Sequence, residues 1–315
     1  MNWRNKEVFV TGGAGFIGSH LVKKLVVEGA HVNILLKKGE SRWRIQDILE
    51  HLTLWEADLA DAASLQSIQS HITPQIIFHL AAHVDSLQSW DIIHSMIQDN
   101  IVGTVNLLTV LRDSGFERFV HVSSSEEYGA APAPLSELQR ESPISPYSFT
   151  KLSSTIFCQM AAKTFGLPIT ILRLFPTYGP FQKGSMVIPS AIHDLLKKKE
   201  FRMTAGEQSR DFIYVDDVVE AFLLIAMAKN IDGEVFNVGS GKPRKVKEVI
   251  ELIKQYIGDD VIVMRGAIPC RAGEGNECYC DNSKIRRLTN WAPRVPLEEG
   301  LQITVAWYKN FFAKN

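Results

Sequence analysis

Tyr147 and Lys151 are the two residues of this chain best suited to move a proton. They begin and end the segment Tyr-Ser-Phe-Thr-Lys, and a spacing of four residues places both side chains on one face of a helix. A cationic amine lowers the pKa of a neighbouring phenol, so we expect Tyr147 to act as a base near neutral pH. Exposed helical pairs of this kind are common, but this one follows Ser123 to Ser125, which end an apolar, strand-like run.

A glycine-rich segment near the N-terminus predicts a phosphate-binding loop. It reads Thr-Gly-Gly-Ala-Gly-Phe-Ile-Gly, with glycines three residues apart at Gly12, Gly15 and Gly18. Glycines permit a tight turn and let the backbone approach a pyrophosphate, while free N–H groups at a helix start hold the anion. The segment lies between the first expected strand and the first expected helix, which favours dinucleotide binding over a plain helix-entry turn.

The choice of dinucleotide depends on the end of the second expected strand. An acidic residue about 20 residues after the glycines hydrogen-bonds the adenosine ribose in NAD enzymes. In its place stand Lys37 and Lys38, which suit the additional phosphate of NADP, so we expect NADP in preference to NAD. A solvated lysine pair at a strand end is the alternative interpretation. Asp58, after the third strand, is placed to reach the adenine edge.

The elements that must position these residues alternate between strand and helix. Buried apolar runs predict strands, and apolar residues three and four apart predict helices. We expect strands at 6–11, 31–36, 52–55, 75–80, 117–122 and 169–174, and helices at 15–28, 61–72, 90–114 and 146–165. Parallel strands need crossovers that cover both faces of a sheet. The predicted fold class is therefore α/β, a doubly wound parallel sheet of the Rossmann type.

The regular alternation ends near residue 175. Prolines and glycines then crowd a short stretch, at Pro176, Gly179, Pro180, Gly184 and Pro189. A helix at 215–228 and a strand at 235–238 return to the sheet, and segments 245–257, 261–264 and 297–312 complete a second lobe. We expect a dinucleotide-binding domain and a smaller, discontinuous substrate-binding lobe, formed respectively by residues 1–175 plus about 212–240 and by about 176–211 plus 241–315.

Composition excludes several classes of partner. The chain has 34 basic and 35 acidic side chains, and this balance does not supply the single-sign field that nucleic acids and anionic membranes require. Apolar runs fall far short of the ~20 residues of a membrane span, and the N-terminus lacks a signal-peptide pattern, so we expect a cytoplasmic protein. The spacing of Cys270, Cys278 and Cys280 lacks the cysteine pairs and histidines of a zinc site, and we predict no metal.

The ordered motifs resemble those of extended short-chain dehydrogenase/reductases, specifically the NAD(P)-dependent sugar-nucleotide epimerase/dehydratase family. The resemblance covers almost the whole chain. Beyond the features above it rests on Asp58-Leu59, His79-Leu80-Ala81-Ala82, Asn100 with the following Ile-Val-Gly-Thr, and segments 173–180, 210–217 and 236–239. It implies a dinucleotide along the carboxyl edge of the sheet, a nucleotide sugar in the cleft beneath the second lobe, and a homodimer through helices 90–114 and 146–165.

The resemblance also assigns residues to the two ligands. The cofactor-binding set is Gly12, Gly15, Phe16, Ile17, Gly18, Lys37, Lys38, Asp58, Leu59, Leu80, Ala81, Ala82, Asn100, Tyr147 and Lys151, the last donating to the nicotinamide ribose. The substrate-binding set is Ser86, Ser125, Val187, Arg210, Arg271 and Glu274. The two arginines match residues that hold the diphosphate, and Val187 and Glu274 match nucleoside contacts. Pro176 departs from the pattern, because many relatives carry there an Asn that touches the substrate.

The resemblance implies one first step and several ways to finish. In the family the Tyr takes a sugar hydroxyl proton while a hydride passes to the nicotinamide, and Ser124 matches the hydroxyl-stabilising residue. Residues 123–129 resemble a stretch of GDP-mannose 4,6-dehydratases, as do Lys37-Lys38 and 41–45. We therefore expect a sugar-nucleotide 4,6-dehydratase in which Glu126 removes the C5 proton.

Ser125 bears on how that reaction ends. It replaces the Asp that dTDP-glucose dehydratases use as the acid toward the 6-hydroxyl, so Glu126 is expected to serve both roles. The alternatives are an NDP-sugar epimerase, a UDP-glucuronate-type decarboxylase, and a non-catalytic nucleotide-sugar binding protein.

Overall fold

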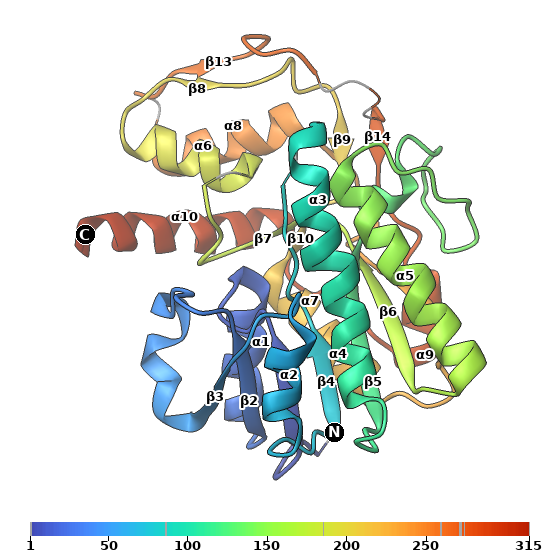
Figure 1. Ribbon diagram of the computed structural model, residues 1–315. Helices are drawn as coiled ribbons and strands as arrows, with labels where there is room; N and C mark the ends of the chain where they lie inside the picture. The colour runs from blue at the N-terminus through green and yellow to red at the C-terminus, as the bar shows by residue number, and fades with distance from the viewer. Residues whose placement is uncertain are drawn as a thin grey trace.

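A seven-stranded parallel sheet forms the centre of the molecule (Figure 1). The structure, a computed structural model, describes residues 2–85, 87–184, 186–258, 260–270, 273 and 275–314. The strand order is β11-β6-β5-β4-β1-β2-β3, with bounds β1 (Glu7–Thr11), β2 (His31–Leu36), β3 (Leu52–Glu56), β4 (Ile76–His79), β5 (Arg118–Ser124), β6 (Ile169–Leu174) and β11 (Val235–Val238). The order changes direction between β1 and β4, and open α/β sheets bind ligands at the carboxyl ends of the strands beside such a point.

Helices cover both faces of the sheet, because successive strand residues point to opposite sides. In β1, Val8 and Val10 join the apolar cluster of one face and Phe9 joins that of the other. One layer contains α1 (Phe16–Val27) and α7 (Val215–Met227); the other, in front of the sheet in Figure 1, contains α2 (Ala62–Gln69), α4 (Gly103–Leu111) and α5 (Pro146–Phe165). The predicted doubly wound α/β fold is confirmed.

The helix expected at 90–114 differs most from its prediction. It begins as a 3₁₀ turn (Trp90–Ile92), continues as α3 (Ile93–Met96), widens into a π-helical turn (Ile97–Val102) and ends as α4. Buried Asn100 lies in the π-helical turn, a feature that often marks functional positions. A 3₁₀ segment at Trp43–His51 was also not predicted. By contrast, β2, β6 and α5 have the predicted bounds.

A smaller lobe lies at the upper end of the view in Figure 1. Its apolar core comes from α6 (Val187–Leu196), α8 (Val246–Ile257) and α10 (Leu297–Lys314). Phe16 and Ile17, which follow the carboxyl end of β1, pack on this core and so join the lobe to the sheet. The remaining elements are β7 (Thr177–Tyr178), β8 (Phe201–Arg202), β9 (Ser209–Arg210), β10 (Ile213–Tyr214), β12 (Arg244–Lys245), β13 (Val263–Met264), β14 (Glu277–Cys278) and α9 (Ser283–Thr289). Across the described ranges, no helix combines the length and apolar character that crossing a membrane requires.

Candidate active site

The glycine loop follows β1 directly and packs closely against the segment after β4. Gly12 has a φ of +70°, which L side chains rarely adopt, and a Cβ there would lie 2.7 Å from the Ala81 nitrogen. A Cβ at Gly18 would lie 2.1 Å from the Gly12 oxygen, so the glycine lets α1 approach the loop. Gly15 is the N-cap of α1, and no side chain caps that helix end. The first N–H groups of α1 are therefore available to an anion, and the cradle fits a dinucleotide pyrophosphate.

Thr11 fixes the segment after β4 beside this loop. Its Oγ1 accepts a hydrogen bond from Ala81 N at 3.2 Å and lies 2.7 Å from His79 Nδ1. Its carbonyl oxygen accepts a hydrogen bond from Leu80 N at 3.1 Å. The structure thus brings Leu80 and Ala81 to the predicted phosphate loop, as a shared cofactor site requires.

Lys37 forms ion pairs with nearby carboxylates. Its Nζ lies 3.0 Å from Asp58 Oδ2 and 3.7 Å from Asp99 Oδ1, and its backbone N–H donates to Glu40 Oε2 at 3.0 Å. The Ala60 N–H and then Lys37 lower the pKa of Asp58, so this carboxylate is firmly ionised. An additional phosphate would meet three carboxylates here, and the residues fit a dinucleotide without that phosphate better.

Asn100 was predicted to contact the cofactor, but its side-chain amide forms hydrogen bonds with other residues of the protein. Its side chain is 2% exposed, Oδ1 accepts from His83 N at 2.7 Å, and Nδ2 donates to Thr150 Oγ1 at 3.0 Å. Leu59, from the same predicted set, lies against α4, where a Cβ at Gly103 would come within 3.0 Å of it. The structure therefore gives Asn100 a positioning part, holding the segment after β4 and α5 together.

Helix α5 begins so that Tyr147 and Lys151 fall on successive turns. Ser145 caps the helix by accepting from Ser148 N, and Ser148 Oγ accepts from Ser145 N in return. Pro146 occupies the first turn, where its missing N–H costs nothing. Lys151 is buried at 4% exposure and Tyr147 is half-buried.

The Ser124 hydroxyl lies near the Tyr147 phenol and favours its ionised form, which brings together two of the predicted catalytic residues. Ser124 lies at the carboxyl end of β5, and its Oγ also accepts from Glu126 N at 3.2 Å. Glu126 is exposed, and its charge acts on Tyr147 and on Cys278 of β14. The carboxylate thus acts on the phenol and on a residue of the lobe.

The prediction that Lys151 lowers the pKa of Tyr147 is wrong for this structure. Removal from water raises the pKa of the phenol, the Glu126 carboxylate raises it further, and the Ser124 hydroxyl opposes them. Burial lowers the pKa of Lys151 to about 8, while the Glu127 carboxylate acts in the opposite direction. The pKa of Lys151 is thus set by burial and by the Glu127 carboxylate rather than by the phenol.

Glu127 is the functional candidate that sequence reasoning missed. The residue is 0% exposed, and its Oε2 accepts a hydrogen bond from Arg173 Nε of β6 at 2.6 Å. The signal was present, because a strand as apolar as β6 buries Arg173 only where an anion meets it. Cys278 was also missed as a site residue; its thiol lies near the buried Ser125.

The predicted substrate residues are only partly described. Arg210 pairs in register with Cys278, so β9 lies beside β14. The Arg210 Nη1 donates to Ser209 O at 2.8 Å. Val187, the first residue of α6, belongs to the apolar cluster that also contains Phe16 and Ile17. Lys38 is exposed, and the backbone oxygen of Pro176 accepts a hydrogen bond from Ile213 N at 3.0 Å. The predicted substrate residues Ser86, Arg271 and Glu274 lie outside the described residues.

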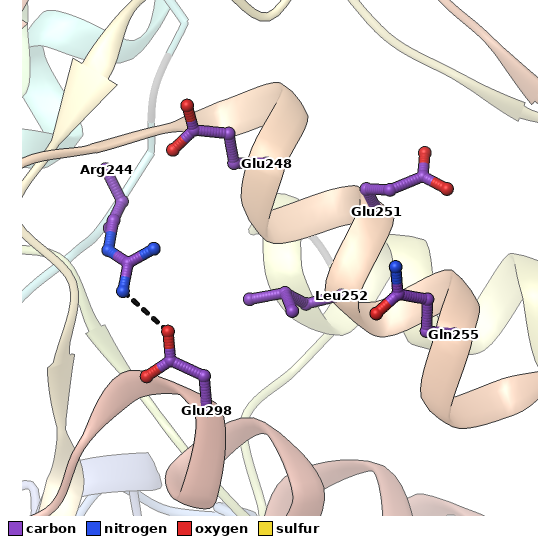
Figure 2. A pocket seen from close by; sticks show the side chains of 6 residues that line it. All are labelled: Arg244, Glu248, Glu251, Leu252, Gln255 and Glu298. Atoms are coloured by element: carbon purple, nitrogen blue, oxygen red, sulfur yellow. Dashed lines mark hydrogen bonds and ion pairs between the residues drawn. The ribbon is translucent and has the colours of Figure 1, made fainter.

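A separate pocket in the lobe does not match the predicted site. Figure 2 shows its lining from β12, α8 and α10, namely Arg244, Glu248, Glu251, Leu252, Gln255 and Glu298. Arg244 Nη2 is bound to Glu298 Oε1 at 2.5 Å. Three glutamates around one paired arginine disfavour an anionic ligand such as a nucleotide sugar.

Known proteins resemble the chain over nearly its full length. The family described as GDP-mannose 4,6 dehydratase matches residues 9–304. A dTDP-glucose 4,6-dehydratase of Escherichia coli is 32% identical over 343 residues, covering 96% of this chain and 94% of that protein.

Two solved structures share the fold. UDP-glucose 4-epimerase from Thermotoga maritima, with UDP-glucose, is 32% identical with a TM-score of 0.90, covering 97% of this chain and 99% of that one. UDP-glucuronic acid 4-epimerase from Bacillus cereus, with UDP-glucuronic acid and NAD, is 29% identical with a TM-score of 0.87, covering 96% and 99%. The similar proteins thus include both dehydratases and epimerases.

Proposed function

The chain belongs to the GDP-mannose 4,6-dehydratase family, and we propose that it acts on a nucleotide-linked hexose through a 4-keto intermediate. Members with this resemblance are enzymes of the isomerase or lyase class. The observation that carries the proposal is the proximity of Ser124 and Tyr147 at the carboxyl end of β5. That edge is where ligands of open α/β sheets bind, beside the glycine cradle.

We propose NAD as the cofactor. The glycine cradle accommodates a dinucleotide pyrophosphate, and the Bacillus cereus relative was solved with NAD. Asp58, Asp99 and Glu40 around Lys37 oppose a further phosphate on the adenosine ribose. When bound, the nicotinamide supplies the acceptor that takes hydride from sugar C4 and later returns it.

In the first step Tyr147 accepts the proton of the C4 hydroxyl, and Ser124 holds the same oxygen. Ser124 already lies near the phenol, so one hydroxyl placed between them reaches both. Lys151, a buried cation, lowers the electrostatic cost of negative charge on the developing C4 oxygen. The product of this step is a 4-keto sugar.

We propose that the reaction continues as a 4,6-dehydration. A C4 ketone acidifies the C5 hydrogen, and Glu126 takes that proton, because its carboxylate lies near Tyr147. Glu126 then returns the proton to the 6-hydroxyl, which leaves as water. Addition of hydride at C6 and of a proton at C5 then gives the 4-keto-6-deoxy sugar, so the net loss is one water. Ser125 has no acid function, so one carboxylate performs both transfers.

A 4-epimerase is the second candidate. The absence of an acid at Ser125 and the two epimerases among the reported structures favour it. In that reaction the keto sugar rotates within the site, so that hydride returns to the opposite face of C4. Glu126 then has no chemical role.

The deciding experiment is incubation of the purified protein with UDP-, GDP-, CDP- and dTDP-hexoses in the presence of NAD. Loss of one water mass indicates dehydration, an unchanged mass with an altered sugar indicates epimerisation, and loss of carbon dioxide from a uronic acid indicates decarboxylation. Binding without any product would support a non-catalytic binding protein. In a dehydratase, Glu126→Gln is expected to retain nucleotide binding and slow exchange of the C5 hydrogen with solvent; full dehydratase turnover in this variant would remove Glu126 from the mechanism.

The domain division and a homodimer complete the proposal. We propose that residues 1–175 plus about 212–240 bind the dinucleotide and that about 176–211 plus 241–315 bind the substrate. On α5, Phe149, Ile156 and Met160 are exposed at helical spacing, and Trp90 is 84% exposed. Helix α5 and the helix that begins at Trp90 are thus proposed to pair with the same helices of a second copy, and light scattering during gel filtration gives the mass that tests this.

A further inference from the structure

We propose that Glu127 is a positioning residue of this site. Its buried carboxylate fixes the turn that carries Ser124 and Glu126, and it supplies the negative charge that keeps Lys151 a cation. The inference rests on the proposed function, in which Lys151 and Tyr147 take part in the first step.

The carboxylate of Glu127 is bound from three elements although it is fully buried. Thr155 Oγ1 of α5 donates at 2.8 Å and Arg173 Nε of β6 donates at 2.6 Å, while Ser123 Oγ of β5 donates to the same oxygen as Thr155. A carboxylate removed from water is stable as an anion only when it is paired and hydrogen-bonded in this way. Glu127 therefore carries its charge into the interior behind the site.

The neighbouring residue anchors the other end of the turn. Tyr128 is 0% exposed and its hydroxyl donates to Asn237 Oδ1 at 2.9 Å. The Arg173 guanidinium, whose Nε binds Glu127, also lies over the Tyr128 ring at 4.7 Å. With Glu127 and Tyr128 both held in the core, the backbone of the turn is fixed on both sides of its contacts, and this turn also carries Ser124 and Glu126.

Glu127 also acts on both members of the proton-transfer pair. Lys151 makes no hydrogen bond or ion pair with the described residues, and the Glu127 carboxylate is the largest influence that favours its charged form. The same carboxylate raises the pKa of Tyr147, after burial and Glu126. A negative charge in the interior thus strengthens proton binding at both groups.

At Lys151 the other titratable groups do not replace this charge. Burial lowers the pKa of His79 to about 3 and that of His121 well below its usual value, so both imidazoles are neutral. Burial raises the pKa of the Cys158 thiol, which is therefore also neutral. Among the described residues, the charged and titratable side chains around the pair or Glu127 are thus His79 from β4, His121 from β5, Glu126 and Tyr128 from the turn, Cys158 from α5 and Arg173 from β6. Glu141 contacts Arg173.

The test is Glu127→Gln, which keeps the size of the side chain and removes its charge. Both limbs of the pH profile for the first hydride transfer are expected to shift to lower pH by about one unit, because both groups bind protons more weakly. The readout is the absorbance of reduced nicotinamide formed in a single turnover with a nucleotide hexose. An unchanged profile in a folded Glu127→Gln variant would overturn the inference.

Glu141→Gln is the matched control. Glu141 binds Nη2 of the same Arg173, but its side chain is 29% exposed and it does not act on Lys151. It loses the same charge, and we expect it to retain the wild-type pH profile. An equal shift in this control would show that the effect belongs to Arg173 pairing and would overturn the assignment to Glu127.

Two further measurements keep the inference testable. If Glu127→Gln fails to fold, the double variant Glu127→Gln with Arg173→Gln removes both buried charges together. It is expected to shift the profile in the same direction but by less, because loss of the Arg173 cation opposes loss of the carboxylate. Without any substrate, melting temperature is measured against pH. Because burial lowers the pKa of folded Lys151 to about 8, stability from this group rises as pH increases through about 8, and in Glu127→Gln the rise begins at lower pH.

These readouts separate the two proposals. A wild-type protein that reduces no cofactor with any nucleotide hexose would defeat the proposed function, whereas the melting comparison would still test Glu127. Identical pH dependence of melting in wild type and Glu127→Gln would overturn the inference even if turnover is found.

Discussion

Asn100 donates a hydrogen bond from Nδ2 to Thr150 Oγ1 at 3.0 Å, one residue before Lys151 in α5. The same amide accepts from His83 N at 2.7 Å and donates to His83 O at 3.1 Å. The segment after β4, the π-helical turn and α5 therefore meet at one side chain. Through it, the helix that carries the proton-transfer pair is fixed relative to the glycine loop.

Asn100→Ala is expected to lower both stability and cofactor affinity. The change leaves the half-buried His83 N–H without its acceptor, which costs about 1–2 kcal/mol of unfolding free energy. Because the segment after β4 loses its tie to α5, the dissociation constant for NAD is expected to rise about tenfold. Urea unfolding and calorimetric titration with NAD measure the two effects.

Gln69→Ala is the control for Asn100→Ala. Gln69 of α2 also donates from a side-chain amide to a buried backbone oxygen, Val110 O, at 2.6 Å, but it does not touch the glycine loop or α5. We expect a smaller loss of stability and unchanged NAD binding. Wild-type stability and NAD affinity in Asn100→Ala would show that the amide does not hold these elements together.

The motif around Asn100 was visible in the sequence, but its structural part was not. Apolar periodicity predicted one helix at 90–114, and periodicity cannot locate the single wide turn that carries Asn100 into the core. Strand and helix types followed from local patterns, and β2, β6 and α5 have their predicted bounds. The α/β fold was therefore predictable because each of its elements has a strong local pattern.

Side-chain pairing across strands was harder to predict. Two glutamates stand together at Glu126 and Glu127, and sequence alone directs attention to the first. The register that sets Ser123 of β5 against Arg173 of β6 decides that the second is buried. Lys37 presents the same difficulty, because its partners Asp58 and Asp99 come from distant segments.

Lys37 and its carboxylates predict a preference for NAD over NADP. The wild type is expected to bind NAD at least about tenfold more tightly, a difference of about 1.4 kcal/mol. Asp58→Asn removes the charge nearest to Lys37 Nζ, at 3.0 Å, and is expected to narrow that ratio by strengthening NADP binding. Protein fluorescence titration with both dinucleotides gives the ratio.

Asp61→Asn serves as the comparison for Asp58→Asn. The substitution at Asp61 removes the same charge three residues away. Asp61 caps α2 by accepting from Ala63 N at 3.0 Å, and it does not pair with Lys37. We expect its NAD to NADP ratio to equal that of the wild type. Equal affinities for the two dinucleotides in the wild type would refute this account of the lysine pair.

His79 and His121 predict how stability depends on acid. They are opposed residues on β4 and β5, their ring centroids lie 5.5 Å apart, and both are fully buried. Burial lowers the pKa of His79 to about 3 and that of His121 well below 6.5, and Lys151 lowers both further. Both imidazoles therefore stay neutral in the folded protein, whereas in the unfolded chain they bind protons below about pH 6.5.

Stability from this pair is full above about pH 6.5 and is lost as the pH falls from there toward about 3, because the unfolded state then binds more protons. Each histidine contributes a slope of up to about 1.4 kcal/mol per pH unit. His121→Phe is expected to remove about half of this slope, and it leaves no partner unsatisfied, since neither ring nitrogen bonds to a described residue. Urea unfolding at about pH 7.5, 6.0 and 5.0 measures the slope of stability against pH. His51→Gln is the control: the His51 side chain is 58% exposed, and this variant is expected to retain the wild-type slope. A slope in His121→Phe equal to that of the wild type would mean that the acid sensitivity arises elsewhere.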